Sequence, residues 1–485
     1  METLHAQLGI YRNERKKEVN IPWEAVVRFK RIDHFENGWH SYQMFVLKDE
    51  DNNLKIQDFD RLITESGNTV FFHDHNILVK GEVAEIETVR VDTGKDFTIA
   101  RFDRCIKKIE ENPNPIVKKL ITPNRRQKHA VLKMDRVIPQ LKQYSILGVE
   151  GCPGAGKSTL CSLFIKKFYQ KYKIIYLAPT HEQIQNMVSK LVNTEAHPLI
   201  MSDESKLDKS LTKYHNSNRS DYNPKFKNLI PSDDKVIIST VNKPLKGLTN
   251  LDKTMVIIDE AGKVSVIEAL SALYTIKKLV FLIFAGDSRQ LGCHSNNNAK
   301  IESCLEFLQR CDSEIWELRN QFRFGEMINY PISTLFYESK MTAMHKKTAT
   351  CIYIEMKGCN HDKQVFCTNE ASLVKHIFKY VSDVFPTRII TPYSKQQTCL
   401  SEKGLNSISI DSAQGSEFDA TIVSFGRNQG RGFLTRKRLN VALTRASNIL
   451  VIIAHEDLKK SISELEVLHE IASINNNLIY FRSES

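Results

Sequence analysis

Gly151-Cys152-Pro153-Gly154-Ala155-Gly156-Lys157-Ser158 decides the fold of this chain, because it matches the phosphate-binding pattern G-x-x-x-x-G-K-[ST] at every fixed position. The apolar run 144–149 before it predicts a buried strand, and residues 159–169 after it predict a helix with apolar residues on one face. Backbone N–H groups of such a loop, together with the positive end of the helix, hold phosphate groups. The sequence therefore predicts a P-loop in an α/β domain.

Two side chains of this loop have predicted roles. Lys157 is expected to reach the β- and γ-phosphates of a nucleoside triphosphate, and the Ser158 hydroxyl is expected to hold Mg²⁺. A glycine turn that only resembles a P-loop is the alternative, and the flanking strand and helix argue against it. The residues expected to contact the nucleotide are Gly151, Gly154, Ala155, Gly156, Lys157, Ser158 and Thr159.

The bulk properties of the 485 residues fit a globular protein of two to four domains, with 41% hydrophobic and 26% charged residues. No apolar run approaches the roughly 18–20 residues of a membrane span, and the N-terminus has no secretory apolar region. The ten cysteines include no C-x-x-C pair, which predicts a reducing compartment, cytoplasmic or nuclear. The net charge of +11 suits a polyanionic partner, of which nucleic acid is the commonest.

The first quarter of the chain differs in pattern from the rest. Short β-branched and aromatic runs separated by polar turns predict a small antiparallel β domain with a barrel-like form, which ends near Asn112-Pro113-Asn114-Pro115. Its strands are expected at 26–32, 42–47, 69–72, 77–91 and 97–102.

Beyond this point strands and helices alternate, and continuous apolar runs are typical of parallel strands buried on both faces. They recur at 145–149, 174–178, 236–239, 255–258 and 279–285, and a second set at 388–390, 407–410, 421–425 and 449–453. Residues 458–471 predict an amphipathic helix. The expected domains are a tail or stalk (1–22), the β-rich domain (23–112), a first α/β domain (113–314) with a polar insertion at about 199–235, and a second α/β domain (315–485).

Two acids follow the apolar strand that begins at Met255. Ligands bind at the carboxyl ends of the strands in open α/β sheets, so Asp259 and Glu260 are expected to face the P-loop. Asp259 would hold Mg²⁺ through water, and Glu260 would polarise the attacking water. A strand with a solvated end is the alternative, and the P-loop upstream favours the catalytic interpretation.

Three further side chains are expected around the γ-phosphate. Gln290 follows another buried strand and could contact the γ-phosphate or its water. Two segments of the second half each offer an arginine in a matching position, Arg323 and Arg445. A guanidinium placed against the γ-phosphoryl oxygens stabilises the charge of the transition state. Surface arginines are the alternative for both. Glu417, between two later strands, is expected to bind a ribose hydroxyl.

Taken in order, these segments resemble superfamily 1 helicases, closest to the up-frameshift RNA helicase group of superfamily 1B. The resemblance runs from Asn124 to about His455, and its last two segments are the most diagnostic. The segments are Asn124–Gln127, the P-loop, Ala178–Thr180, Ile238–Thr240, Asp259–Glu260, Gly286–Gln290, Gln321–Arg323, Thr391–Tyr393, Gln414–Glu417 and Ala442–Arg445.

The resemblance implies two tandem RecA-like P-loop domains with ATP and Mg²⁺ in the cleft between them, preceded by a small accessory barrel that clamps nucleic acid. Asn124 and Gln127 would read the adenine, and Phe322 would lie against the base. Gln290, Arg323 and Arg445 would sense the γ-phosphate. The residues that would grip nucleic acid are Pro179, Thr180, Thr240, Thr391 and Tyr393.

The activity implied by the resemblance is an ATP-dependent helicase or translocase that moves 5′-to-3′ on single-stranded or tailed duplex RNA or DNA. We expect a monomer that works with other replication or RNA-processing proteins. Because no cysteine- and histidine-rich regulatory domain precedes the β domain, a viral or otherwise minimal member is expected. Gly262-Lys263 and Gly292-Cys293 depart from the usual family residues.

Two other functions remain open. One is an ATP-switched RNA clamp or ribonucleoprotein remodeller that does not unwind duplexes, and the other is a P-loop NTPase unrelated to nucleic acid, such as a nucleotide kinase. The spacing of Cys351, Cys359, His361 and Cys367 fits no familiar zinc pattern, so a metal site there is disfavoured. The basic residues of 431–438 are a candidate for phosphate contacts.

Overall fold

The computed structural model describes the chain in discontinuous ranges that fall into two compact units. The described ranges are 24–34, 39–49, 61–64, 69–73, 76–80, 84–91, 107, 117, 128–131, 145–218, 234–243, 253–274, 276, 278–293, 301–311, 314–345, 348–357 and 366–482. The first unit comprises residues 1–121, 266–274 and 294–302, and the second comprises the rest. No helix of these ranges is both long and apolar enough to cross a membrane. The expected tail 1–22 and strand 97–102 lie outside them.

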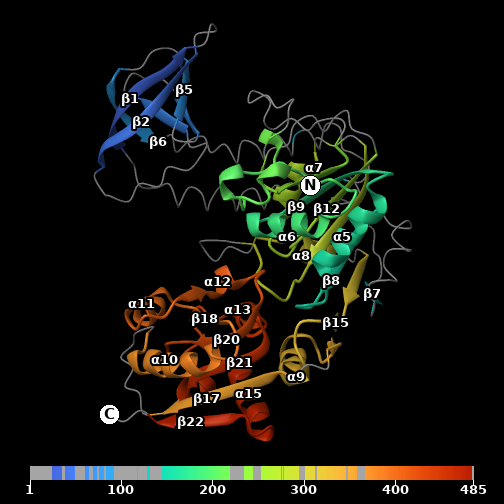
Figure 1. The fold of residues 1–485 in the computed structure, drawn as a ribbon, viewed down its shortest axis with the longest axis vertical. Coiled ribbons are helices and arrows are strands. Elements are labelled where there is room, and N and C mark those ends of the chain that lie inside the picture. The colour runs from blue at the N-terminus through green and yellow to red at the C-terminus, as the bar shows by residue number, and fades with distance from the viewer. Residues whose placement is uncertain are drawn as a thin grey trace. The chain divides into compact units, whose positions relative to one another are not determined.

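Six antiparallel strands of the first unit, blue in Figure 1, form a closed barrel in the order β1-β2-β5-β4-β3-β6. Register shifts interrupt the pairing of β1 with β2, and such bulges bend a strand. The expected run 77–91 is two strands, β5 and β6, and β3 is an additional strand. The bounds are β1 Glu24–His34, β2 Trp39–Asp49, β3 Arg61–Thr64, β4 Thr69–His73, β5 Asn76–Lys80 and β6 Ile86–Val91; the unit also holds helix α7, Val266–Leu273.

The second unit begins with an eight-stranded parallel sheet in the order β10-β11-β9-β12-β13-β8-β14-β7. The five strands expected in this region are confirmed to within two residues at each end. β14 lies beyond residue 314, yet it pairs with β8 and β7 and completes this first sheet. The bounds are β7 Lys128–Val131, β8 Ile146–Gly151, β9 Lys173–Ala178, β10 Leu199–Ile200, β11 Val236–Thr240, β12 Thr254–Ile258, β13 Leu279–Gly286 and β14 Ile315–Leu318.

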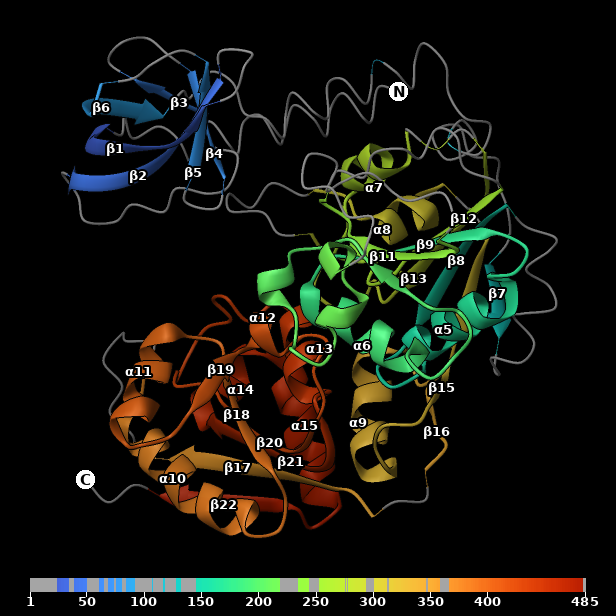
Figure 2. The ribbon, with the colours of Figure 1, turned by 45° about the horizontal axis from the view of Figure 1, so that its top comes forward.

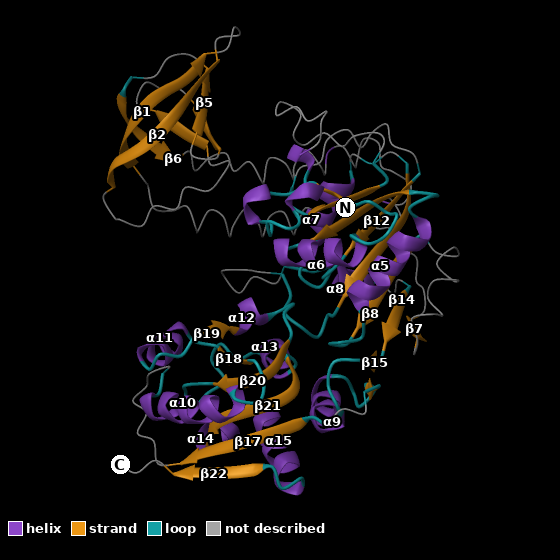
Figure 3. Ribbon diagram, in the orientation of Figure 1, coloured by secondary structure: helices purple, strands orange, loops and turns teal. Residues whose placement is uncertain are grey.

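Helices cover both faces of the first sheet (Figure 3). α5 (Lys157–Phe168) and α6 (His181–Leu191) contact the sheet on the face to which Leu147 and Val149 point. Successive strand residues alternate between faces, so the Cα of Gly148 faces the opposite side of the sheet. Leu308 of α8 (Cys304–Arg310) packs there, 3.3 Å from where a Cβ on Gly148 would lie. In α5, Leu160 and Phe164 are buried as expected, whereas Leu163 is only half-buried.

The polar stretch that was expected as an insertion is partly described. β10 adds an edge strand to the first sheet, and three short 3-10 helices follow at Glu204–Lys206, Thr212–Tyr214 and Asn216–Asn218. Leu207 and Leu211 between them are buried in the core of the unit. This part of the stretch is therefore anchored to the sheet, and residues 219–233 lie outside the described ranges.

A six-stranded parallel sheet, orange to red in Figure 2, follows in the order β19-β18-β20-β21-β17-β22. α10 and α11 contact β18, and α14 and α15 contact β17. β17 and β22 are strands that the sequence patterns did not indicate. The bounds are β15 Asn320–Gln321, α9 Glu326–Phe336, β16 Thr342–Ala343, β17 Thr350–Lys357, α10 Thr368–Ser382, β18 Thr387–Thr391, α11 Ser394–Glu402, β19 Ser407–Ser409, α12 Ile410–Ala413, β20 Phe418–Ser424, α13 Arg436–Leu443, β21 Ala446–His455, α14 Glu456–Ser461, α15 Ser463–Ile474 and β22 Leu478–Arg482.

The prediction of a single helix over 458–471 is wrong. The segment contains two helices, α14 and α15, separated at Ile462, whose backbone is extended (φ −133°, ψ 100°). The side chains of Leu458, Ile462 and Leu465 are all buried, so the apolar period continues across the break. The expected strand 407–410 also ends one residue early, since Ile410 begins α12.

Candidate nucleotide site

The P-loop joins β8 to α5 and requires glycine at two positions. Gly154 has φ +73° and Gly156 has φ +80°, a region that residues with a Cβ rarely adopt. A Cβ on Gly154 would lie 2.5 Å from the Cβ of Arg323, and the Phe322 N–H donates to the Gly154 carbonyl at 2.9 Å. The Gln321–Arg323 segment therefore packs directly on the loop.

Replacing Gly154 with alanine is expected to weaken ATP binding at least tenfold, because the new methyl group would push Arg323 away from the loop and strain the backbone by about 1–3 kcal/mol. Gly404→Ala is the matched control, since Gly404 has φ +78° and no atom within 4 Å of the added Cβ. Titration with a fluorescent ATP analogue measures the affinity. Equal losses in the two variants would contradict packing as the cause.

Lys157 lies at the mouth of the loop. Its Nζ donates to the carbonyl oxygens of Gly151 and Cys152, at 2.9 and 3.2 Å. No side chain caps the N-terminus of α5, so its first N–H groups face the loop without a competing side-chain acceptor. The loop thus combines an ammonium group with helix N–H groups, which is the chemistry that binds phosphate.

Ser158 and Asp259 meet at the carboxyl ends of β8 and β12. The Ser158 hydroxyl donates to Asp259 Oδ2 at 2.9 Å, and the Tyr176 hydroxyl donates to the same oxygen at 2.8 Å. Burial raises the pKa of Asp259, and the negative charge of Glu260 raises it further. The hydrogen bonds that Asp259 accepts act in the opposite direction. A hydroxyl and a carboxylate on adjoining elements are hard oxygen donors, and they fit Mg²⁺ in its usual setting beside phosphate.

Glu260 follows β12 with φ +50°, an unusual conformation for a residue with a Cβ. Its N–H donates to Asp259 Oδ1 at 2.9 Å, which ties the two acids together. Gly262, one of the departures from the family pattern, has a physical reason here: a Cβ would lie 2.9 Å from the Asp287 carbonyl oxygen. The loops after β12 and β13 therefore pack too closely for any other residue.

Gln290 and Arg445 are in contact, although they are 155 residues apart in the sequence. Arg445 Nη2 donates to Gln290 Oε1 at 3.3 Å, and its other donors bind the carbonyls of Val441 and Ser416 at 2.9 and 3.2 Å. Only 2% of Arg445 is exposed, and burial, with Arg323 nearby, lowers the pKa of its guanidinium to about 9. Gln290 Nε2 donates to Asp287 Oδ2 at 3.1 Å.

Arg323 links the P-loop to the later segments. Its Nη1 donates to the Thr444 carbonyl at 2.8 Å, and its Nε pairs with Glu417 at 2.7 Å. Glu417, which was expected to bind a ribose hydroxyl, is exposed and pairs with this arginine; its role toward a ribose stays a prediction. Phe322 is 45% exposed beside the loop. The structure thus brings both predicted arginines to the edge of the first sheet.

The residues expected to contact nucleic acid lie in different environments. Thr180 is exposed and caps α6 together with Gln183, and Pro179 and Thr240 are half-buried. Tyr393 is half-buried, with its ring 6.5 Å from that of Phe433. Thr391 is fully buried, so its side chain does not reach the surface.

Two expected adenine contacts, Asn124 and Gln127, lie outside the described residues, as do Cys359 and His361. Cys367 caps α10 through a hydrogen bond from the Glu370 N–H at 3.2 Å. Within the described ranges, no group of three or more histidine, cysteine or acidic side chains could hold a metal ion.

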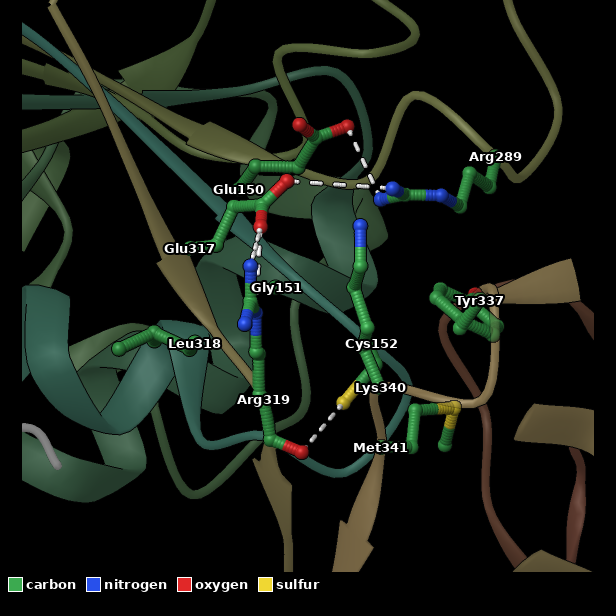
Figure 4. Close-up of a pocket in the computed structure, with 10 residues that line it drawn as sticks. All are labelled: Glu150, Gly151, Cys152, Arg289, Glu317, Leu318, Arg319, Tyr337, Lys340 and Met341. Carbon is green, nitrogen blue, oxygen red and sulfur yellow. Dashed lines mark hydrogen bonds and ion pairs between the residues drawn. The ribbon is translucent and has the colours of Figure 1, made fainter. Parts of the chain in front are cut away.

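A small cavity lies beside the start of the P-loop (Figure 4). Its volume is about 20 Å³, which suits one water molecule and not a base. Charged side chains pair along its lining: Glu317 lies 2.8 Å from Arg319 at the end of β14, and Arg289 lies 3.6 Å from Glu150 and 3.8 Å from Glu317. Arg289, from the loop after β13, therefore contacts side chains of both β8 and β14.

Four residues at the site were not assigned roles from the sequence: Tyr176, Asp287, Tyr337 and Asn440. Asp287 lies inside a segment that carries the family resemblance and Asn440 lies two residues before another, so their positions were an available signal. Tyr337 follows α9 and has no such signal. Its hydroxyl donates to Asp287 Oδ2 at 2.6 Å and accepts from Asn440 Nδ2 at 2.8 Å.

Comparison with known families matches two models, each described as an AAA domain, over residues 124–299 and 301–457. The chain is 24% identical over 335 residues to the replicase polyprotein 1ab of murine coronavirus, a match that covers 65% of this chain and 4% of the polyprotein. It is 28% identical over 286 residues to an uncharacterised ATP-dependent helicase of Methanocaldococcus jannaschii, covering 50% of this chain and 42% of that protein. The chain thus spans less than half the length of these relatives.

Solved structures of helicases are also similar. The arterivirus nonstructural protein 10 helicase in complex with DNA aligns with 18% identity and a TM-score of 0.43, over 81% of this chain and 72% of that one. The crystal structure of the same arterivirus helicase aligns with 18% identity and a TM-score of 0.41, over 87% and 78% of the two chains.

Proposed function

We propose that this chain is a superfamily 1 helicase that hydrolyses ATP to move along single-stranded nucleic acid and separate duplexes, in line with the two AAA domain matches and the similarity to an ATP-dependent helicase. Two contacts support the proposal most strongly: the hydrogen bond between Arg445 and Gln290, and the packing of Arg323 against Gly154 of the P-loop. In this proposal, these two arginines of the second half would lie beside the γ-phosphate bound by the first. Such an arrangement makes hydrolysis depend on how the two halves are held together.

The nucleotide would be held by the P-loop residues, with Lys157 on its phosphates. Ser158 and Asp259 would hold Mg²⁺, which supplies charge neutralisation at the β- and γ-oxygens. Glu260 would orient and deprotonate the attacking water. Arg323 and Arg445 would stabilise the charge that develops on the γ-phosphoryl oxygens. Asn124, Gln127 and Phe322 remain our proposed contacts to the base.

Movement would follow from the same contacts. With the γ-phosphate present, both halves gain attractive contacts through Arg323 and Arg445, which favours their approach. After hydrolysis these contacts are lost, which favours separation, since a ligand shifts a conformational equilibrium by its differential binding. The alternation would carry the chain along a strand in the 5′-to-3′ direction.

The nucleic acid would cross surfaces built by loops of both sheets. Pro179, Thr180, Thr240 and Tyr393 keep exposed area for such contacts, whereas Thr391 would act through its backbone. Arg438 stacks on the exposed ring of Phe433 at 3.4 Å, next to Tyr393. Aromatic rings beside guanidinium groups are a common platform for bases and phosphates, and the net charge of +11 supports a polyanionic ligand.

We propose the barrel as the nucleic-acid clamp of superfamily 1B and two RecA-like domains after it. Their junction, expected from the sequence between residues 314 and 315, is proposed to lie after Leu318 because β14 pairs within the first sheet. Either RNA or DNA would serve as the ligand, and a monomer would suffice, since both arginines come from the same chain. A reducing compartment fits the cysteine spacing, and partners in replication or RNA processing fit the viral relative.

ATP hydrolysis measured with and without single-stranded RNA or DNA tests this function. Stimulation by oligonucleotides is the expected result, and hydrolysis that ignores them would favour an unrelated P-loop NTPase. An ATP-switched clamp would show stimulation without strand separation, so unwinding assays distinguish it from the motor.

In the same assay, Arg445→Ala is expected to lower kcat about 100-fold with little change in KM, because the lost guanidinium acts on charge that develops only in the transition state. Arg310→Ala, on the exposed side of α8, is the control. A kcat near that of the unaltered protein would remove Arg445 from the catalytic site.

A further inference from the structure

The Tyr337 hydroxyl joins the two α/β halves at a buried point. Tyr337 directly follows α9, which packs on β17 and α15 of the second half. Only 4% of the surface of Tyr337 is exposed. The hydroxyl donates to Asp287 Oδ2 at 2.6 Å, at the end of β13, and accepts from Asn440 Nδ2 at 2.8 Å, on α13. One oxygen atom thus contacts the loop after the first sheet and a helix of the second half.

Asp287 passes this contact on to Gln290. Its Oδ2 also accepts from Gln290 Nε2 at 3.1 Å, and its Oδ1 accepts from the Arg289 N–H at 3.0 Å. With its Nε2 bound to the carboxylate, the Gln290 amide turns Oε1 toward Arg445 Nη2, 3.3 Å away. The reversed amide would place an NH₂ group against the guanidinium and an oxygen against the carboxylate, so one orientation is selected.

The contacts form a closed ring of side chains. From Arg445 they run through Gln290, Asp287 and Tyr337 to Asn440 on α13, and the backbone connects Asn440 to Arg445, two residues beyond the end of that helix. Asn440 Nδ2 also donates to the Arg289 carbonyl at 2.9 Å. The Arg289 guanidinium lies 5.3 Å from the centre of the Tyr337 ring, and Figure 4 shows both on one side of the cavity. Every member of the ring is at least nine-tenths buried, so water does not replace a lost bond easily.

We propose that Tyr337 is a positioning residue for ATP hydrolysis: its hydroxyl holds Asp287 so that the Gln290 amide faces Arg445 in the orientation needed at the γ-phosphate. This inference rests on the proposed ATPase function. The Tyr337 hydroxyl bonds to both α/β halves at once. The Gln290 amide is therefore held in this orientation only when the two halves are in contact. A tyrosine that merely fills space would act through its ring, which phenylalanine retains.

Tyr337→Phe removes the hydroxyl and tests the proposal. The kcat of ATP hydrolysis is expected to fall about 10- to 100-fold, because misplaced catalytic groups cost rate, while KM for ATP stays within about threefold. Tyr330→Phe is the matched control, since Tyr330 lies on α9 and is 54% exposed. An unchanged kcat in Tyr337→Phe would overturn the proposal.

A double-mutant cycle separates positioning from general stability. If Tyr337 acts through Gln290, then Tyr337→Phe added to Gln290→Ala should lower kcat less than about twofold further. Full multiplication of the two losses would show that Tyr337 acts elsewhere and would contradict the proposal. Should Tyr337→Phe unfold in thermal melts, Asn440→Ala removes the donor on the other side of the hydroxyl and is expected to lower kcat with the same non-additivity toward Gln290→Ala.

ATP hydrolysis by the unaltered protein distinguishes failure of the proposed ATPase function from failure of the role of Tyr337. If it and Tyr330→Phe both fail to hydrolyse ATP, the proposed function fails and the role of Tyr337 falls with it. If both hydrolyse ATP and Tyr337→Phe equals them, only the positioning role is wrong.

Discussion

Lys157→Ala is expected to abolish ATP hydrolysis, to the rate seen without protein. The Lys157 ammonium is held at the mouth of the P-loop by the carbonyls of Gly151 and Cys152, where it would meet the β- and γ-phosphates. Alanine removes the only side-chain charge of the loop, so both phosphate binding and stabilisation of the transferred group are lost. Steady-state phosphate release measures the effect.

Lys166→Ala is the matched control, because Lys166 is an exposed lysine in the last turn of the same helix, α5. It is expected to hydrolyse ATP at the rate of the unaltered protein. Retention of more than about one tenth of the activity in Lys157→Ala would mean that the nucleotide binds elsewhere.

Glu260→Gln is expected to stop turnover while ATP still binds. The substitution keeps the size of the side chain and the N–H bond to Asp259, but an amide cannot accept the proton of the attacking water. A loss of about 10³- to 10⁴-fold in kcat is expected, at the upper end of general-base effects. Single-turnover hydrolysis and equilibrium ATP binding, measured on the same preparation, separate chemistry from affinity.

Glu402→Gln, at the exposed end of α11, controls for the change of charge. Turnover by Glu260→Gln within tenfold of the unaltered protein would remove Glu260 as the base. Loss of ATP binding in the same variant would instead assign Glu260 a role in holding the nucleotide.

The strands of both sheets were largely predictable, because parallel strands buried on both faces appear as continuous apolar runs. One of the strands that was missed has a clear physical cause. β22 is an edge strand in which Ile479 and Tyr480 are 49% and 60% exposed, so it has no buried run to detect. The division of the expected helix 458–471 into α14 and α15 was also missed. Leu458, Ile462 and Leu465 are all buried, so the apolar period continues through the break at Ile462.

Local motifs also placed part of the site. The P-loop glycines, Asp259 and Glu260 were predictable because loop geometry and strand ends are set by nearby residues. The pairing of Arg445 with Gln290 was expected only in outline, and the Tyr337 contacts were not expected at all. Asp287 and Tyr337 are 50 residues apart, and Tyr337 and Asn440 are 103 apart, so packing between the halves and not local sequence decides these bonds.

Strand separation with ATP, on RNA and DNA duplexes that carry a single-stranded 5′ or 3′ tail, measures the proposed motor activity itself. We expect ATP-dependent unwinding of a 5′-tailed duplex by the unaltered protein and none by Lys157→Ala. ATP hydrolysis that is stimulated by the tails but releases no strand from any duplex would contradict the motor and favour an ATP-switched clamp.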